Sequence, residues 1–555
     1  MMTKKYLRDN NLLAIPFDKG VGVCVMKSED YQMKMNKIID LPQVEKIENS
    51  RKNAKNPVLK EEERIIDILK SLKTKEKISE NMYNRLRPSG SQPARLYGLA
   101  KVHKEDIPMR PVLSMPGTAY YNVAKQVATW LSLIPECQIN TSTKTVCDSL
   151  SKLQLEDDEE LVSFGVVALY TNVPVMEAIN VCADLLFSKW TLPVDKETFI
   201  ILAKIASCDV VMLTHDGYYK QVDGLAMGSP PAPHLANGWM SQFDNDIKGN
   251  AKVYERYMDD IIRDIKTVKI DNKLDEVNSY HENLTFTIER ERNGRLSYLD
   301  AETRRSDNGI ISTTWYTKPS DTGLIMNYHA LAPNKYKRAV VSGFVHRIYR
   351  ACSSWTLFHE SLDKAKSILL QNQYPPVFFE KVIHETLTRI VQGNQHQSNE
   401  KDETEKPFLL FLQYRGKSTE SYAKDIHKAG VECRVIFTLK KLKTVMPSLK
   451  EPVEKFQKSG LVYQIKCPRC SACYVGQTGR HLQVRFKEHL SRKGPIKDHM
   501  SKCEGRISEE SVNILGTTSK GYDHLLTLEA LWIREINPEL NTKDEFKSRE
   551  FTIKL

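Results

Sequence analysis

The spacing of apolar and polar residues over the first 390 positions indicates alternating strands and helices. Residues 161–170 (LVSFGVVALY) and 252–265 (KVYERYMDDIIRDI) are rich in β-branched and aromatic side chains, which is typical of strands. Residues 283–305 alternate on both sides of an Asn-Gly pair, which favours a β-hairpin. Residues 364–373 and 380–392 have the apolar spacing of helices.

A second patterned region follows a polar segment. Residues 391–407 are polar apart from the first and have no apolar period, so we interpret them as a linker. Beyond it, residues 461–467 and 473–478 predict short strands, and residues 482–492 and 525–536 predict helices. Because 555 residues are enough for three or four domains, we expect an α+β multidomain protein.

Composition argues against a membrane protein. Hydrophobic residues make up 41% of the chain, the mean hydropathy is −0.45, and no long apolar run is free of charge. The first twenty residues lack the apolar core of a signal peptide. We therefore expect an intracellular protein with no membrane partner.

The net charge of +11 is concentrated near the C-terminus. Residues 408–555 contain 27 Lys and Arg against 17 Asp and Glu, whereas residues 1–407 contain 54 against 53. This asymmetry indicates a polyanionic partner, although a solvated basic face is the simpler alternative. Residues 434–443 (RVIFTLKKLK) are a candidate for tracking DNA phosphates, in which case affinity falls steeply with salt.

Four of the eleven cysteines crowd together near the C-terminus. Cys467-x-x-Cys470 followed by His499-x-x-x-Cys503 has zinc-finger-like spacing, with Cys473 as an alternative to Cys470. Sulfur and imidazole ligands suit Zn²⁺ rather than catalytic Mg²⁺, so the site is expected to be structural. The alternative is a group of free thiols, and the other seven cysteines read as reduced core thiols.

The pair Asp259-Asp260, in RYMDDII, has the chemistry of a divalent metal site at the tip of a hairpin. Nucleotidyl transfer uses two Mg²⁺ (or Mn²⁺) ions held by carboxylates, and a further carboxylate must come from a neighbouring strand. Lys101 and Arg110 are suited to triphosphate and template phosphates, and Gly228-Ser229 allows a primer or nucleotide to approach the backbone. Their simpler readings are a basic loop and a turn before a helix.

Taken in order, seven segments resemble the reverse transcriptase of Penelope-like retroelements. The resemblance spans most of residues 15–350 and implies a right-hand polymerase with fingers, palm and thumb. We expect fingers at 1–145 with part of their N-terminal region missing, palm at 146–310, a thumb-like helical region at 311–390, the linker at 391–407 and a basic connector at 408–455. The matching segments are FDKGVGVCVM, RLYGLAKVHK with MRPVLS, SFGVVALYTNVPV, GLAMGSPPAPHLAN, RYMDDII, LTFTIE with GRLSYLDAE, and WYTKPSDTGLIMNYHALAPNKYKRAVVSGFVHR.

The chain departs from this family at one metal ligand. The family's strand reads Ser-Phe-Asp-Val, whereas this chain has glycine at the third position, Gly165. Tyr170, five residues later, stands where the family keeps an aromatic gate against the ribose 2′-OH, so a register shift that brings in Asp157 or Asp158 would misplace it. We expect polymerisation to be slower than with an aspartate by roughly a thousandfold or more. Asp300 is expected to be structural.

Residues 459–489 resemble the GIY-YIG endonuclease module, which implies a small α/β nuclease domain at 456–555. The resemblance gives Glu529 the role of Mg²⁺ ligand, Tyr463 that of positioning or deprotonating the water, and Arg485 that of stabilising the phosphate. Tyr474 and His489 orient the others, and Asn541 completes the pattern. The simpler reading makes the two tyrosines core residues and the glutamate a solvated helix residue.

Two functions follow from these resemblances. The first is a retroelement enzyme that nicks target DNA and copies an RNA template from deoxynucleoside triphosphates, located in the nucleus by role. The second is a catalytically inactive nucleic-acid-binding remnant. Gly165 favours the second for the polymerase region, whereas the complete set of nuclease residues favours the first for the C-terminus.

Overall fold

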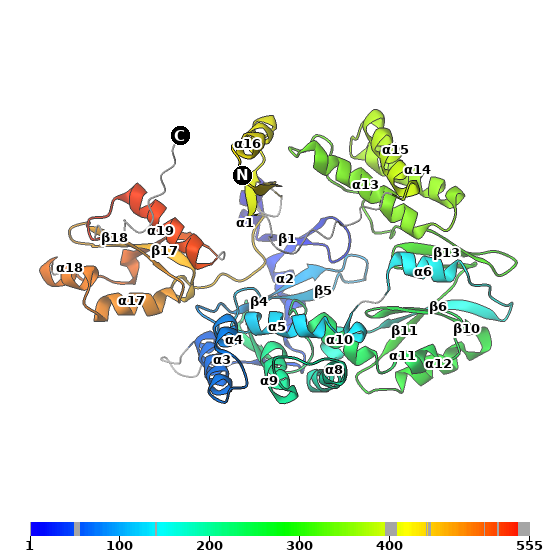
Figure 1. Cartoon of the computed structure of the whole chain (residues 1–555), viewed down its shortest axis with the longest axis horizontal. Helices are drawn as coiled ribbons and strands as arrows, with labels where there is room; N and C mark the ends of the chain where they lie inside the picture. Colours follow the sequence, from blue (N-terminus) through cyan, green and yellow to red (C-terminus); the bar gives the residue numbers. More distant parts are fainter. Residues whose placement is uncertain are drawn as a thin grey trace.

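The computed structural model describes residues 2–48, 56–138, 141–393, 408–439, 441, 446–503, 505–518 and 521–541 (Figure 1). Residues 394–407 of the predicted linker lie outside these ranges, as do residues 440, 442 and 443 of the predicted DNA-tracking segment.

A five-stranded sheet organises the N-terminal part, in the order β3-β8-β7-β4-β5. Alternate residues of β4 are buried, as its apolar alternation dictates, and β4 pairs antiparallel with β5 and parallel with β7. Because β7 and β8 come from residues 210–221, the sheet crosses the predicted boundary between fingers and palm. The elements are α1 (Met2–Asp9), β1 (Leu12–Pro16), β2 (Val23–Lys27), α2 (Ser28–Ile39), β3 (Val44–Lys46), α3 (Pro57–Thr74), α4 (Glu80–Leu86), β4 (Ala94–Ala100), β5 (Met109–Ser114), α5 (Tyr121–Leu131), β7 (Val210–Thr214) and β8 (Gly217–Gln221).

A four-stranded sheet, in the order β11-β6-β10-β9, carries the aspartate pair. The hairpin β9 (Tyr254–Tyr257) and β10 (Asp260–Lys266) confirms the strands predicted at 252–265, and β10 pairs along its length with β6 (Glu159–Val166). Strand β6 ends earlier than predicted, because Ala168 turns the chain at φ 49° into the short helix α7 (Leu169–Asn172). Nearby elements are α6 (Thr143–Leu150), α8 (Val175–Lys189), α9 (Lys196–Ser207), α10 (Ala232–Met240), α11 (Asp244–Lys248), α12 (Ile270–Asn278) and β11 (Phe286–Arg290).

The predicted Asn-Gly hairpin is only partly right. Asn293 and Gly294 have positive φ and form the turn, but only Arg292 and Arg295 pair across it. Strand β11 pairs with β6 instead, because that edge buries Phe286. The strand after the turn joins a separate sheet of β12 (Arg295–Tyr298), β13 (Ala301–Arg305) and β14 (Ile311–Trp315).

Three helices, α13 (Asn334–Ala351), α14 (Trp355–Gln371) and α15 (Pro376–Val391), form a separate apolar cluster. They confirm the helices predicted at 364–373 and 380–392. The Ser354 hydroxyl caps α14 by accepting from Leu357 N–H at 3.3 Å, and a proline starts α15, where no N–H is needed.

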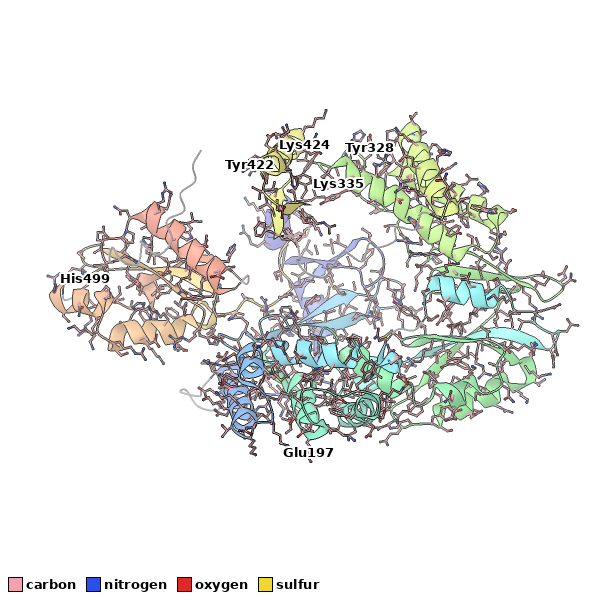
Figure 2. All side chains as sticks on the ribbon, viewed as in Figure 1. Glu197, Tyr328, Lys335, Tyr422, Lys424 and His499 are labelled. Carbon is pink, nitrogen blue, oxygen red and sulfur yellow. The ribbon has the colours of Figure 1, made fainter. Side chains whose placement is uncertain are left out.

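A small unit with two parallel strands packs against α13. It consists of β15 (Phe408–Gln413), α16 (Lys417–Lys428) and β16 (Cys433–Thr438). The Tyr336 hydroxyl donates to the Phe437 carbonyl at 2.9 Å, and Lys335 lies over the Phe437 ring. Figure 2 shows Lys335 on the side of α13 that faces α16, which carries Tyr422 and Lys424.

The C-terminal domain is a three-stranded antiparallel sheet, in the order β18-β17-β19, packed with three helices. Its elements confirm the two strands and two helices predicted there: β17 (Leu461–Lys466), β18 (Cys473–Thr478), α17 (Leu482–Ser491), α18 (Pro495–Cys503), β19 (Val512–Thr517) and α19 (Tyr522–Ile536). Within the described part of the chain, no helix is both long and apolar enough to span a bilayer.

Candidate active sites

The aspartate pair sits at the tip of the β9–β10 hairpin. Met258 has φ 59° and turns the chain, and the Asp259 carbonyl accepts from the Val166 N–H at 2.9 Å. This bond fixes the hairpin tip to the end of β6. Asp260 is the first residue of β10 and lies directly opposite Gly165 in the antiparallel register.

Gly165 leaves room for a side chain beside Asp260. A Cβ built at residue 165 would lie 3.8 Å from Asp260 Oδ1 and 3.4 Å from the Thr287 hydroxyl oxygen, both ordinary contact distances. A carboxylate at this position would therefore stand next to that of Asp260. Asp158 cannot replace it, because it lies past the other end of β6, where it pairs with Lys266 at 2.8 Å.

The electrostatics of the hairpin tip favour cation binding. Burial, and then the neighbouring Asp259 carboxylate, raise the pKa of Asp260, while Lys19 and Lys318 oppose this shift. Burial and the Asp259 charge also raise the pKa of Tyr170 to about 12, so the phenol stays neutral. The charge of Asp259 thus acts on Tyr170, whose predicted role as an aromatic gate stays a prediction.

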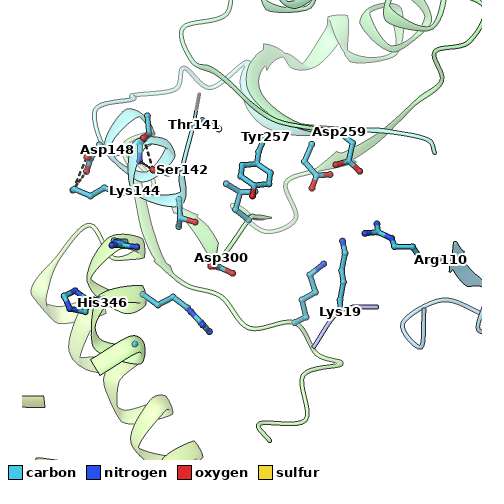
Figure 3. Close-up of a pocket in the computed structure, with 18 residues that line it drawn as sticks. Lys19, Arg110, Thr141, Ser142, Lys144, Asp148, Tyr257, Asp259, Asp300 and His346 are labelled. Atoms are coloured by element: carbon cyan, nitrogen blue, oxygen red, sulfur yellow. Dashed lines mark hydrogen bonds and ion pairs between the residues drawn. The ribbon is translucent and has the colours of Figure 1, made fainter. Parts of the chain in front are cut away.

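Asp259 and Asp260 open onto a cavity of about 1300 Å³ that is lined by both acidic and basic side chains; Figure 3 shows Lys19 and Arg110 on the same side as Asp259, and Lys144 beside Asp148. Asp300 also lines the cavity, although the sequence suggested a structural role for it. Sequence reasoning missed most of the basic groups, since they come from distant segments. They are Lys19, Lys144, Lys318, Arg347 and Arg350.

Of the two predicted phosphate-binding residues, Arg110 and Lys101, only Arg110 lines this cavity. Arg110 lines it and pairs with Asp18 at 3.1 Å. Lys101 lies near Arg110: burial, and then the Arg110 charge, lower the pKa of Lys101. The Lys101 side chain is not among the residues that line the cavity.

Gly228 and Ser229 are placed by packing. Gly228 has φ 123°, and a Cβ there would lie 2.1 Å from the Leu113 carbonyl oxygen, so the close approach of the two backbones requires glycine. The Ser229 hydroxyl is buried and donates to the Ala206 carbonyl at 3.3 Å. Neither residue lines the cavity.

The second site gathers on the first strand and first helix of the C-terminal domain. The Tyr463 hydroxyl lies 2.7 Å from His489 Nε2 and accepts from Arg485 Nε at 3.3 Å. Arg485 and His489 thus share a helix face, as their spacing predicts. Burial lowers the pKa of His489 to about 4, so its ring is neutral at pH 7. Its Nε2 can then accept a hydrogen bond from the Tyr463 hydroxyl.

Burial of the two tyrosines agrees with the simpler interpretation of both as core residues. Tyr463 is fully buried and Tyr474 is 4% exposed. The ring centroids of Tyr474 and His489 are 5.2 Å apart. Gly476 permits this arrangement, because a Cβ there would lie within 2.9 Å of both tyrosines.

Glu529 comes from α19, the last helix, and Asn541 from the segment that follows this helix. Glu529 lies on α19, and its charge contributes to raising the pKa of Tyr463, after the larger effect of burial. The Asn541 side chain bonds both backbone groups of Val475, accepting at 2.8 Å and donating at 2.7 Å. Asn541 therefore completes the edge of β18.

Cys467, Cys470, His499 and Cys503 form a candidate metal centre, with their donor atoms all within 4.8 Å of one another. Tetrahedral Zn²⁺ with bonds of about 2.3 Å would place two sulfurs about 3.8 Å apart, and Cys467 and Cys503 Sγ are 3.9 Å apart. Among the described residues, Cys473 lies outside this group, buried in β18. Figure 2 places His499 at the outer end of the domain.

Two thiols of this centre differ in how readily they ionise. Although burial opposes it, hydrogen bonds from the backbone at Cys470 and from the His499 ring lower the pKa of Cys467 to about 6. The bonds of Cys503 to Cys470 and Cys467 raise its own pKa to about 11. The first thiol thus ionises well before the second.

Comparisons with known proteins give limited similarities. A family model described as the animal helix-turn-helix domain matches residues 324–384, and no curated protein matches the chain. Telomerase from Candida albicans, solved with a fragment of telomeric RNA, superposes with a TM-score of 0.44 at 9% identity, covering 71% of this chain and 69% of that one. The RNA-dependent RNA polymerase of a human picobirnavirus gives 0.38 at 11% identity, covering 71% and 82%. Similarity at these TM-scores assigns neither a fold nor an activity.

Proposed function

We propose that the chain is a retroelement protein with an RNA-directed DNA polymerase fold and a C-terminal GIY-YIG-type endonuclease. The observation that carries the polymerase proposal is the Asp259-Asp260 hairpin tip, held against β6 and facing a cavity with basic walls. The carboxylates of this cavity suit divalent ions, and its lysines and arginines suit a phosphate backbone. The substrates are an RNA template, a DNA primer end and deoxynucleoside triphosphates.

The metal ions would be Mg²⁺ or Mn²⁺, which stabilise charge on the attacking and leaving oxygens when bound. Asp259, Asp260 and the neighbouring Asp300 are the acidic residues available to hold them. The place beside Asp260 where the family's first metal-binding aspartate belongs is taken by Gly165, which has no side chain. The polymerase is therefore impaired, and an inactive nucleic-acid-binding remnant is the second candidate for this region.

A primer-extension assay with Mg²⁺ and with Mn²⁺ tests the polymerase proposal. We expect Gly165→Asp to accelerate extension by roughly a thousandfold or more, since each ~1.4 kcal/mol of transition-state stabilisation is tenfold in rate. Gly165→Asn is the matched control, because it fills the same space without the charge. Equal rates for the parent and the aspartate variant would refute the argument from the missing ligand.

The endonuclease proposal rests on the convergence of Tyr463, Arg485 and His489 near Glu529. Glu529 would hold one divalent ion, and Arg485, which is partly exposed, would meet the scissile phosphate. The buried Tyr463 acts as a positioning residue that fixes both Arg485 and His489. The target is DNA, and the nicked strand would supply the primer end. Because chromosomal DNA is the target in this role, we infer a nuclear location.

Plasmid nicking tests this second activity. We expect Glu529→Gln to abolish nicking, because the isosteric amide cannot hold the ion. Glu535→Gln, an exposed position on the same helix, should nick at the parental rate. Undiminished nicking by the Glu529 variant would overturn the assignment.

The Cys467, Cys470, His499 and Cys503 centre fits Zn²⁺ by ligand type and spacing, and we assign it a structural role. It joins the turn between β17 and β18 to α18, since two ligands come from each. A bound ion would hold these two parts of the small domain together.

A further inference from the structure

One loop of the fingers region is in close contact with the C-terminal domain. This loop links α4 to β4, and its Ser91 carbonyl lies 2.5 Å from Nε2 of the buried His481. The Gln92 amide donates to the Gln457 carbonyl at 3.0 Å and to the Ser459 hydroxyl at 2.9 Å. The Ser459 hydroxyl in turn donates to the Gly90 carbonyl.

The fit at Gly90 leaves no space for a side chain. Gly90 has φ 62°, and a Cβ there would lie 2.2 Å from the Gly479 carbonyl oxygen and 2.8 Å from Ser459 Cβ. Residues of the same region hold the loop in place, because the Glu62 carboxylate accepts from the Gly90 and Ser91 N–H groups at 3.2 and 2.6 Å. The conformation of the loop is therefore held by the fingers region as well as by the C-terminal domain.

These contacts touch the two elements that build the second site. Ser459 lies just before β17, which carries Tyr463, and His481 is the residue from which α17 starts. The Leu482 N–H donates to the Lys458 carbonyl at 2.9 Å, so the beginnings of β17 and α17 are also joined to each other. Figure 1 shows α17 and β17 on the side of this domain nearest β4.

On the other side, the same loop leads into the sheet of the first site. Residues 88–92 enter β4, whose partner β5 carries Arg110 at the edge of the large cavity. Tyr218, on another strand of that sheet, donates its hydroxyl to the Gln457 side chain at 2.8 Å. The contact therefore bridges the supports of both sites.

We propose that the loop at residues 90–92 is a docking surface for the C-terminal domain and a positioning element of its site. By holding the starts of β17 and α17 together, it sets the alignment in which Tyr463 meets Arg485 and His489. It also keeps the two sites at a fixed separation, so that a strand cut at one is retained for extension at the other. This inference rests on the proposed endonuclease and polymerase only for its catalytic consequences.

Two glycine variants of the full chain separate docking from general backbone strain. Gly90 and Gly430 both have positive φ, but a Cβ at Gly430 meets nothing within 4 Å. Gly90→Ala should therefore undock the domain, whereas Gly430→Ala bears only the backbone strain. We expect Gly90→Ala to raise the radius of gyration in small-angle scattering, to speed hydrogen exchange of the Leu482 amide at least tenfold, and to lower plasmid nicking at least tenfold. Gly430→Ala should match the parent in all three.

Gln92→Ala is a milder second variant that deletes two contacts without backbone strain. It should shift the same three quantities in the same direction, and it keeps the test valid if Gly90→Ala does not fold. A Gly90 variant that stays docked, or one that undocks with parental Leu482 exchange and parental nicking, would overturn the inference. A parent chain that cuts no DNA would refute the endonuclease alone, because scattering and exchange report docking without activity.

Discussion

At the scale of single residues, the arrangement around position 165 follows from the sequence and the register together. The sequence identifies the missing carboxylate by its place in a strand motif, and the pairing of Gly165 with Asp260 explains why that place matters. What the sequence leaves open is the burial of Tyr463, which it offers only as the simpler of two interpretations. Strand periodicity indicates which face a side chain takes, but the covering by α17 depends on tertiary packing.

The partly buried His489 gives a pH-dependent stability with a defined sign. Its pKa of about 4 in the folded state lies below about 6.5 for an exposed ring, so the unfolded chain binds the proton more tightly. Stability is therefore full above pH 6.5 and is lost as the pH falls towards 4, by roughly 3 kcal/mol in total. Urea unfolding at pH 7 and pH 4.5 measures this loss.

The matched variants are His489→Gln and His524→Gln. The first should remove most of this pH dependence, whereas the second, at an exposed position of α19, should keep it. A parental slope in His489→Gln would show that other groups cause the acid sensitivity.

At the scale of elements, most helices and strands agree with the apolar pattern, and the one clear error is instructive. The Asn293-Gly294 turn forms, yet the strands on either side of it enter different sheets. Local turn chemistry predicted the reversal, but the free edge of β6 and the burial of Phe286 decided the pairing of β11. Strand partners depend on distant segments that a local pattern does not contain.

The metal centre makes a prediction about how α18 is held. Cys503→Ser removes one of the four ligands, so we expect zinc content to fall from one ion per chain towards none. The melting temperature of the C-terminal domain should drop by at least about 5 °C, since a loss of ~1 kcal/mol shifts a small domain by roughly that amount. Inductively coupled plasma mass spectrometry and calorimetry measure both quantities.

Cys473→Ser is the control for this centre, and it decides between the two ligand sets that the sequence left open. Cys473 lies in β18, outside the cluster. Its variant should therefore keep one zinc per chain. Loss of zinc in Cys473→Ser, with retention in Cys470→Ser, would contradict the ligand set given by the structure.

At the scale of the whole molecule, the set of basic side chains in the large cavity could not be predicted from any one segment. It combines Lys19 and Lys318, which lie near Asp260, with Arg347 and Arg350 of α13. These positions are more than 300 residues apart at the extremes, and only the fold brings them to one cavity. The charge excess of residues 408–555 directed attention to the C-terminus, whereas these side chains belong to a region with balanced charge.

Arg347 and Arg350 of α13 give the last prediction, because they line the cavity from the helix whose His346 lies across from Asp259 in Figure 3. If they bind phosphates of a primer–template duplex, each contact releases about one counterion on binding. The double variant Arg347→Ala/Arg350→Ala should lower the slope of log Kd against log salt by roughly 2 in magnitude, with no dependence on sequence. Fluorescence anisotropy with a labelled duplex, over a range of salt and without nucleotides, measures the slope independently of catalysis.

The control is the double variant Arg304→Ala/Arg338→Ala. These two arginines pair with Glu360 and Glu385 and lie outside the cavity lining, so this variant should keep the parental slope. A parental slope in Arg347→Ala/Arg350→Ala would show that α13 does not bind the duplex. Other basic residues would then have to bind the strand on which the carboxylates act.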